Sequence, residues 1–355
     1  MKYTDQIAQK YLGTVDKAWM VYAADENVRD GAASGGAVSA LLIHLLQAGE
    51  IDGAVVTRIK CEDGIGCEVV LARDEQTILS ARTSKYTDVP VARETKRLLR
   101  DFEGKVAIVA LPCHATILRK MAQKDPVLKS KIKYIISLFC GHSCRDELLS
   151  GVLLKRGIDP KDVGEFYFRK GRWRGNMQGK LRDGTEFGFP FKRFSYYHNV
   201  NFFCLTRCLS CHDHTGYEAD FCVGDAWLRE MKKEPIKHSI IFSRNGRGTE
   251  IVEKMLEEQK FIGRGIDKRT VFRAQKRALI YHYNVTARAK AARLYKMKIK
   301  DPVNTKVRWN DWLAGHIIML NYRLSKSPRG QKWVFRIPWP IIYLYFLFLK
   351  FLQNF

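Results

Sequence analysis

The chain has 355 residues, of which 46% are apolar, and a formal net charge of +24. This length and apolar content suffice to bury one large core or two smaller ones, which excludes a disordered chain. The positive charge favours anionic partners, such as cofactor phosphates, acidic coenzyme tails, lipid headgroups or nucleic acid, without choosing among them. The opening MKYTDQIAQK lacks the apolar core of a secretory signal, so we expect a cytoplasmic protein whose nine cysteines are ligands or buried thiols rather than disulfides.

The first part of the chain has the pattern of an α/β protein. Apolar and β-branched runs predict strands at residues 18–23, 53–57, 68–72, 105–111 and 134–139. After the first strand, Ser34, Gly35 and Gly36 precede an amphipathic helix, where backbone N–H groups and the helix dipole would suit a phosphate. A plain tight entry into the helix explains the same glycines equally well. Lys85 lies in the loop SKYTDVP, before a charged helix at about residues 90–101.

Cysteines follow two of the predicted strands. Cys113 comes directly after the strand at 105–111, and Cys140 and Cys144 follow the strand at 134–139. Open α/β sheets place their sites at the carboxyl ends of strands. A single such cysteine is more often a buried small hydrophobe, but two strands in succession that end in one favour a site.

After residue 160 the apolar pattern changes to a period of two, which predicts a β-rich insertion with a hairpin turn at Asp183 and Gly184. The insertion carries the run RKGRWRG, in which Arg172 and its basic neighbours flank Trp173. Such a turn could hold an anionic aromatic cofactor by charge and stacking, with a solvated basic turn as the alternative.

The densest cysteine cluster follows, in the stretch CLTRCLSCHDHTGYEADFCVGD. Its Cys208 and Cys211 form a C-x2-C pair, a spacing that lets two thiolates converge on one metal ion or cluster. A short strand then ends at Gly224 and Asp225, and a further strand, turn and helix close the α/β part near residue 260.

The chain from residue 265 onward reads as basic and helical. The segment from Arg288 to Lys332 holds twelve Lys or Arg against two Asp, and an apolar run of 13 residues follows at 337–349. That run is shorter than the roughly 20 residues of a spanning helix. With Trp333 and other aromatics near its start, it favours an interfacial membrane anchor, and docking on a partner subunit or dimer mate is the alternative.

The fold class expected from these patterns is α/β with α+β character: a mixed sheet core, a β-rich insertion and a basic helical C-terminal region. The expected parts are residues 1–160, an α/β flavin-binding part; 161–260, the insertion, cysteine cluster and closing α/β elements; 261–332, the basic helices; and 333–355, the apolar tail.

The ordered motifs resemble the β subunit of coenzyme F420-reducing hydrogenases and dehydrogenases, a family of iron–sulfur flavoproteins. They run from about residue 18 to 260 and are SGGAVSALLIHLLQAGEIDGAVV, SKYT, GKVAIVALPCHATILRKM, IISLFC, the C-x2-C pair and ADFCVGD. The resemblance implies a 4Fe-4S cluster held by Cys113, Cys140, Cys208 and Cys211. The extra thiols Cys144, Cys204 and Cys222 are then buried side chains or, with a further ligand, a second cluster.

The resemblance also implies FAD, with its pyrophosphate against Ser34–Gly36 and with Lys85 near its ring or a phosphate. Arg172 and Asp225 are further candidates for the flavin site. The implied activity is hydride transfer between coenzyme F420 and the flavin, which passes single electrons to the cluster. The acceptor would be a redox partner subunit, a ferredoxin or a membrane-associated molecule, and we expect an oligomer.

Three alternatives stay open at this point. One keeps FAD and the cluster but uses ferredoxin, without coenzyme F420, to reduce a lipid-linked sugar or a tetrapyrrole. Another is a non-catalytic electron-transfer subunit. The third is a zinc-stabilised nucleic-acid-binding module that uses Cys204, Cys208, Cys211, His212 and His214. The cysteines at the strand ends count against this module, so nucleic acid is a disfavoured partner.

Overall fold

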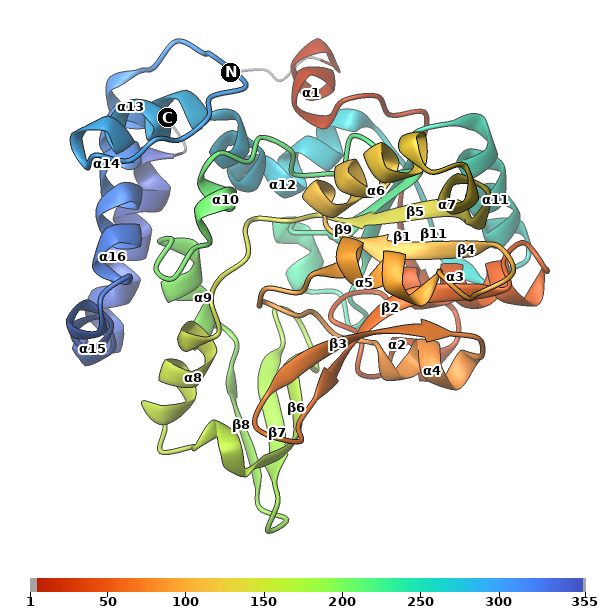
Figure 1. Cartoon of the computed structure of the whole chain (residues 1–355), viewed down its shortest axis with the longest axis horizontal. Helices are drawn as coiled ribbons and strands as arrows, with labels where there is room; N and C mark the ends of the chain where they lie inside the picture. Colours follow the sequence, from red (N-terminus) through yellow and green to blue (C-terminus); the bar gives the residue numbers. More distant parts are fainter. Residues whose placement is uncertain (1–4, 354–355) are drawn as a thin grey trace.

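An eight-stranded mixed sheet forms the centre of the protein, as seen in a computed structural model that describes residues 5–353 (Figure 1). The last two residues of the predicted tail lie outside the described range. In spatial order the strands are β11 (Phe261–Ile266), β1 (Ala18–Ala23), β10 (Ser239–Ser243), β9 (Phe221–Asp225), β5 (Ile132–Leu138), β4 (Val106–Ala110), β2 (Gly53–Lys60) and β3 (Gly66–Ala72).

The middle of this sheet is parallel and its edges are antiparallel. Strands β9, β5, β4 and β2 run in one direction, while β3, β10, β1 and β11 join by antiparallel pairing. The parallel strands are nearly continuous apolar runs because helices cover both of their faces. Their carboxyl ends therefore meet at one edge of the sheet, where ligand sites of such folds lie.

Two helical layers sandwich the sheet. One face carries α1 (Asp5–Leu12), α5 (Val91–Leu98), α6 (Pro112–Lys124), α7 (Pro126–Lys131) and α12 (Lys268–Tyr283); the other carries α2 (Glu26–Arg29), α3 (Ala37–Gln47), α4 (Glu75–Ser80) and α11 (Gly246–Glu257). Side chains alternate between the two layers along β1, where Met20 faces one core and Trp19 and Val21 face the other.

The predicted insertion is a separate three-stranded antiparallel sheet that projects from the body of the protein (Figure 1). Its strands are β6 (Val163–Lys170), β7 (Asn176–Leu181) and β8 (Glu186–Pro190), preceded by the 3-10 turn η1 (Pro160–Asp162). The helices α8 (Glu147–Leu154), α9 (Lys192–Asn199) and α10 (Thr206–Leu209) connect it to the large sheet, and the turn η2 (Arg229–Lys232) follows β9.

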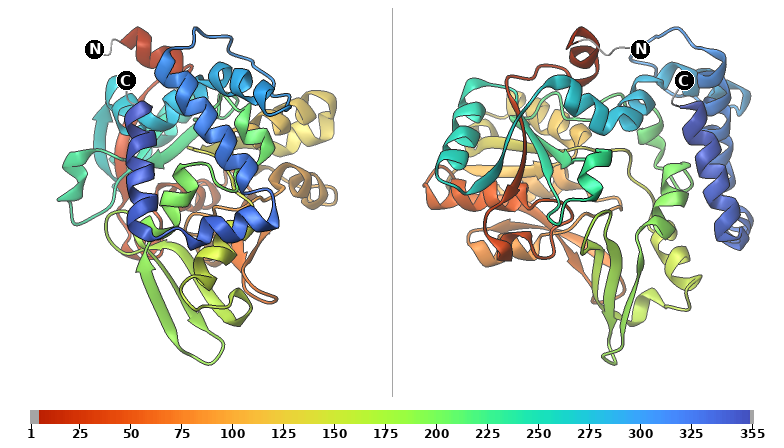
Figure 2. Two further views of the ribbon diagram at one scale, coloured as in Figure 1. Left: turned by 90° about the vertical axis from the view of Figure 1, so that its left-hand side faces the viewer. Right: turned by 180° about the vertical axis from the view of Figure 1, so that it is seen from behind.

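The C-terminal helices form one flank of the molecule (Figure 2). They are α13 (Val285–Leu294), α14 (Trp309–Leu324), α15 (Pro328–Arg336) and α16 (Trp339–Leu352), and they share a core with α8, α9 and the insertion. Within residues 5–353, no single helix has the length and hydropathy of a membrane span, although α15 and α16, bent by 102°, pass that test as a pair.

The architecture confirms the expected fold class, with one difference at the start of the helical region. Residues 261–266 were expected there, but they form β11, an edge strand of the large sheet. The two glycines of FIGRGI weaken the strand pattern in the sequence. Gly263 is needed for close pairing, since a Cβ there would lie 2.2 Å from the carbonyl oxygen of Met20. The helical region thus begins at Lys268.

Candidate functional site

Three parallel strands deliver chemically active side chains to the same edge of the sheet. Cys113 follows β4 in the first turn of α6, Cys140 lies two residues beyond β5, and Asp225 ends β9. The chain enters α6 through Pro112, whose fixed φ suits the first helical position. Backbone N–H groups at the start of α6 lower the pKa of Cys113, but burial has the larger effect and raises it.

The C-x2-C pair lies in a loop that internal hydrogen bonds hold in shape. Cys208 lies on α10, and its Sγ accepts a hydrogen bond from the backbone N–H of Ser143 at 3.4 Å. Beyond Cys211, the buried carboxylate of Asp213 accepts hydrogen bonds from three successive backbone N–H groups at 2.7–3.0 Å. His282 of α12 places its two ring nitrogens 2.7 and 3.0 Å from the carbonyl oxygens of Cys140 and Cys211.

The structure brings together the four thiols predicted as cluster ligands. Burial raises the pKa of Cys140 well above its ordinary value, and the nearby thiols of Cys208, Cys211 and Cys113 raise it further. Burial likewise raises the pKa of Cys113, and it raises the pKa of Cys211 to about 12. The other thiols contribute to both shifts. Each of these groups thus lies within electrostatic range of its neighbours, in a site where only a strong cationic partner would hold several thiolates.

Four cysteine thiols are the donor set that a four-iron cluster takes, and their role as its ligands stays a prediction. Among the described residues, no three His, Cys, Asp or Glu side chains lie close enough to hold one metal ion. A four-iron cluster is larger than an ion and spreads its four cysteine ligands over its corners, and backbone N–H bonds to sulfur are typical of such sites. His214, a zinc ligand in the alternative reading, instead contacts the Cys140 carbonyl oxygen and Gln275 at 3.0 and 3.2 Å.

The three extra thiols are buried and directed at backbone carbonyl groups. Cys144 donates to the oxygen of Tyr86 at 2.7 Å and pairs with Cys204 through an isolated β-bridge. Cys204 donates to Leu205, and Cys222, within β9, donates to Gly216. All nine cysteines are free thiols.

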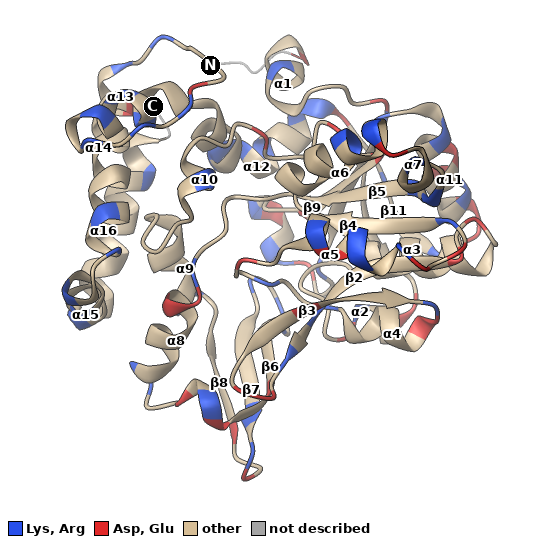
Figure 3. Cartoon of the chain, in the orientation of Figure 1, with Lys and Arg blue, Asp and Glu red and all other residues tan. Residues whose placement is uncertain are grey.

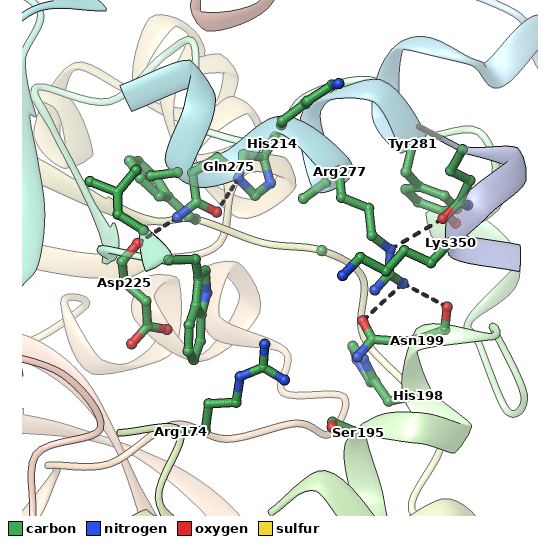
Figure 4. Close-up of a pocket in the computed structure, with 18 of the residues that line it drawn as sticks. Arg174, Ser195, His198, Asn199, His214, Asp225, Gln275, Arg277, Tyr281 and Lys350 are labelled. Atoms are coloured by element: carbon green, nitrogen blue, oxygen red, sulfur yellow. Dashed lines mark hydrogen bonds between the residues drawn. The ribbon is translucent and has the colours of Figure 1, made fainter. Parts of the chain in front are cut away.

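A cavity of about 980 Å³ lies next to the segment that carries Cys140 (Figure 4). Phe139, Gly141 and His142, which flank Cys140, line one wall, and α12 lines another. The cavity can admit a dinucleotide-sized ligand. The Nε1 of Trp173 and the Nε2 of His142, both at the cavity, are buried without a hydrogen-bond partner in the described structure, so a bound molecule could accept or donate there.

Cations converge on the cavity from several elements. Burial lowers the pKa of Lys350, and so do the charges of Arg277, Arg174, Arg229 and Lys232, all of which line the same space. Arg277 donates to neutral oxygens, namely Gln353 Oε1 at 3.2 Å and the backbone and side-chain oxygens of Asn199 at 2.9 and 3.1 Å. Burial and the charge of Arg174 lower its pKa to about 10. Clustered cations of this kind form a site for an anion.

Asp225 anchors the insertion to the sheet beside the cavity. Its carboxylate accepts two hydrogen bonds, at 2.7 and 3.0 Å, from Arg169, which is 1% exposed. The guanidinium of Arg169 lies 4.9 Å from the ring centre of Trp227, which meets Trp173 edge to face at 5.1 Å. The charge of Asp225 is thus neutralised by the protein, and the aromatic rings remain available to stack on a ligand.

The other predicted flavin residues lie outside the lining of this cavity. The hydroxyl of Ser34 donates to the carbonyl oxygen of His238 at 2.8 Å, and the N–H of Gly35 donates to Ser239 Oγ at 3.0 Å. A Cβ on Gly35 would lie 2.8 Å from the oxygen of Val21, so the lack of a side chain permits close packing on the sheet. Gly36 caps α3 with a φ of 78°. The phosphate role of this loop stays a prediction.

Lys85 and Arg172 also lie outside the lining of the cavity. The ammonium of Lys85 bonds the carbonyl oxygens of its own loop at 81–83, and burial lowers its pKa to about 8. Arg172 is exposed at the tip of its turn, where φ is 61° at the nearby Arg174. Trp173 and Arg174 of the same turn are the side chains that line the cavity.

Sequence reasoning missed the contribution of α12. Gln275, Arg277 and His282 contact the cavity or the cysteine loops, and Gln275 and His282 are seven residues apart on one helix face. Polar residues at that spacing indicate a site only if they lie on the buried face of the helix, and the sequence does not show which face is buried.

The fold and site define an α/β protein with a cationic cavity at the carboxyl edge of a mixed sheet, next to the segment that carries Cys140. Two family models match the chain: coenzyme F420 hydrogenase/dehydrogenase beta subunit N-term at residues 18–94, and the C terminus of the same subunit at 103–268. The chain belongs to this family of oxidoreductase subunits, which confirms the resemblance stated from the motifs.

Individual relatives agree with the family models. The chain is 32% identical to the coenzyme F420-dependent sulfite reductase of Methanocaldococcus jannaschii over 244 residues, 62% of this chain and 36% of that enzyme. It is 26% identical to the coenzyme F420 hydrogenase subunit beta of Methanococcus voltae, over 72% of this chain and 86% of that subunit. A chain of the F420-reducing [NiFe] hydrogenase complex from Methanosarcina barkeri shares the fold, with a TM-score of 0.62, 22% identity, and coverage of 82% of this chain and 98% of that one.

Proposed function

We propose that the protein is an iron–sulfur flavoprotein that carries electrons between coenzyme F420 and a partner, through FAD and a 4Fe-4S cluster at Cys113, Cys140, Cys208 and Cys211. The observation that carries the proposal is the cationic cavity lined by the residues on either side of Cys140. Phe139 and Gly141 flank Cys140 in sequence, so a molecule in the cavity would lie next to a cluster ligand.

The side chains of the cavity suit FAD in both of its parts. The cations around Lys350 would hold the pyrophosphate, and Trp173 and Trp227 would contact the flat ring system. A bound flavin would supply the exchange between hydride and single electrons that links coenzyme F420 to the cluster. The protein's own residues position the ring, neutralise phosphate charge and exclude water from the cluster side. The phosphate and glutamates of the coenzyme F420 tail would suit the cationic lining of the same cavity.

The proposal places the protein in the cytoplasm, where a ferredoxin or a partner subunit would take or supply the single electrons. Nine free cysteines suit a reducing compartment. The relatives named as hydrogenase subunits support a multi-subunit setting.

The decisive experiment is the anaerobic visible spectrum of the purified protein, with flavin and iron assays, before and after addition of reduced coenzyme F420. We expect flavin and cluster absorbance at the start, and bleaching of both when the coenzyme is added. Bands that only dithionite or reduced ferredoxin bleaches would reject coenzyme F420 as the donor and keep the cofactors. A colourless protein that contains zinc would overturn the proposal.

A further inference from the structure

The last helix of the chain is apolar on all sides, yet only one of its sides is buried. Ile342, Phe346 and Leu349 of α16 pack into the core shared with α9 and α14. On the opposite side, Leu344 is 64% exposed and Phe348 is 49% exposed. A helix without a polar face is typical of a fully apolar environment. Exposure of its outer side to water is therefore unfavourable.

The exposed apolar surface continues onto the neighbouring helices. Trp312 and Leu320 lie two turns apart on the outer side of α14, and Trp333 of α15 is 55% exposed. These helices lie beside α16 on the same flank of the molecule (Figure 2). We call the outer side of α14, α15 and α16 the docking face.

Cations surround the docking face. From residue 284 to the C-terminus, 14 residues are Lys or Arg and only Asp301 and Asp311 are acidic. Asp311 is already paired with Arg308, at 2.9 Å. The blue segments of α13 to α16 show this excess in Figure 3, and exposed members next to the face include Arg323, Lys326, Arg329, Lys332 and Arg336.

We propose that the docking face binds the surface of an anionic lipid bilayer. Exposed Trp and Leu side chains would enter the boundary of headgroups and acyl chains, and the surrounding Lys and Arg would contact anionic headgroups. Charge complementarity selects this partner over a second copy of the chain, because a two-fold interface would place the same cations against each other. The 102° bend between α15 and α16, and the buried inner side of α16, fit a helix lying in the interface rather than crossing it.

The inner side of the same helix lines the cationic cavity. Phe346, Lys350 and Gln353 form part of its wall, so a bilayer on the docking face would lie about one helix diameter, ~10 Å, from the cavity. If the proposed redox function holds, this position gives a membrane-borne acceptor access to the site. The docking itself does not depend on that function, so the two can fail separately.

The test is co-sedimentation of the full-length protein with vesicles of phosphatidylcholine alone or mixed with phosphatidylglycerol. We expect the protein to bind the mixed vesicles. Binding should be about tenfold weaker to vesicles without phosphatidylglycerol, and added salt should reduce it. The double substitution L344Q and F348Q should weaken binding by about tenfold or more, because it removes apolar side chains without changing charge. The matched control is Val127→Gln on α7, which is 62% exposed on another part of the molecule.

A second readout keeps the test independent of the variant's folding. Brominated lipids should quench the tryptophan emission of the unmodified protein when Trp312 and Trp333 enter the bilayer. Absence of binding to the mixed vesicles, equal binding by the double variant, or unquenched emission in bound protein would each overturn the proposal. A discrete dimer that the double variant dissociates, without vesicle binding by the unmodified protein, would assign the face to a second copy instead.

Discussion

The sheet unit, residues 18–266, differs from the C-terminal helices, residues 268–352, in how far its apolar and charged side chains find partners within the protein. In the sheet unit the strands of the large sheet are covered on both faces, and most of the ion pairs join residues of the unit itself. In the C-terminal helices the inner faces are buried, while large apolar side chains and many cations remain on the outside. The large sheet buries both of its apolar faces, whereas the C-terminal helices leave large apolar side chains on the surface.

The largest expected effect is the loss of iron on substitution of a proposed cluster ligand, which tests whether the redox site belongs to the sheet unit. All four proposed ligands belong to the sheet unit, so Cys208→Ser or Cys211→Ser should remove the cluster absorbance while FAD and vesicle binding remain. Iron assay and the anaerobic spectrum measure the outcome. The partly buried Cys61 and the buried Cys222 are controls, and their serine variants should keep iron. Full iron content in both ligand variants would disprove the ligand assignment.

The next effect concerns the ion pair that joins the insertion to the sheet. Asp225→Asn leaves the buried guanidinium of Arg169 without its charge partner, so we expect the free energy of unfolding to fall by about 3 kcal/mol. Urea denaturation measures it. The control is Glu68→Gln, which breaks the more exposed pair with Arg58 and should cost at most about 0.5 kcal/mol. Equal losses would mean that burial adds nothing to the Asp225 pair.

Close packing of the sheet unit is tested at Gly35. Its added Cβ would meet backbone atoms of Val21, Lys237 and Ser239 within 2.9 Å, so Gly35→Ala should destabilise the protein by about 2 kcal/mol even without cofactor. Gly246→Ala, where nothing lies within 4 Å, should cause no loss. If Gly35→Ala leaves stability intact and weakens only FAD binding, the loop is a phosphate site after all.

At the cavity wall contributed by α12, we expect a substitution to weaken FAD binding and leave stability unchanged, the reverse of the result expected for Gly35→Ala. Arg277→Gln removes a half-buried cation whose hydrogen bonds go to neutral oxygens, so we expect FAD binding to weaken about tenfold, or about 1.4 kcal/mol, without a lower melting temperature. Arg269→Gln, in an exposed pair on the same helix, is the control. Unchanged FAD affinity in Arg277→Gln would remove this cation from the flavin site.

The smallest effect is a pH dependence on the surface of the sheet unit. Lys133 and Tyr134, with Arg247, lower the pKa of the Glu50 carboxyl from 4.5 to about 2. The depressed pKa means that the stabilisation is present above pH 4.5 and is lost as the pH falls toward 2. Because Glu50 is partly exposed, Glu50→Gln should cost at most about 1 kcal/mol at pH 7. The cost should disappear in melting curves near pH 2, and a constant cost would reject the ionic origin.

The sequence alone was sufficient for most strands of the sheet unit, with β11 as the exception, and it predicted that the thiols lie near one another. Apolar runs locate β1, β2, β4 and β5, and the rule that parallel strands end at one edge brings Cys113 and Cys140 together. The C-x2-C spacing keeps Cys208 and Cys211 close for local geometric reasons. These inferences depend on short stretches of chain, where periodicity and covalent reach decide the outcome.

The cavity and the docking face were decided by the tertiary structure. Arg174 rather than Arg172 reaches the cavity because the backbone turns between them, and Arg277 contributes because α12 packs over the cysteine loops. The sequence of α16 shows an apolar helix but not which side is buried. Contacts between segments far apart in the chain make those choices, and they depend on packing that no local pattern contains.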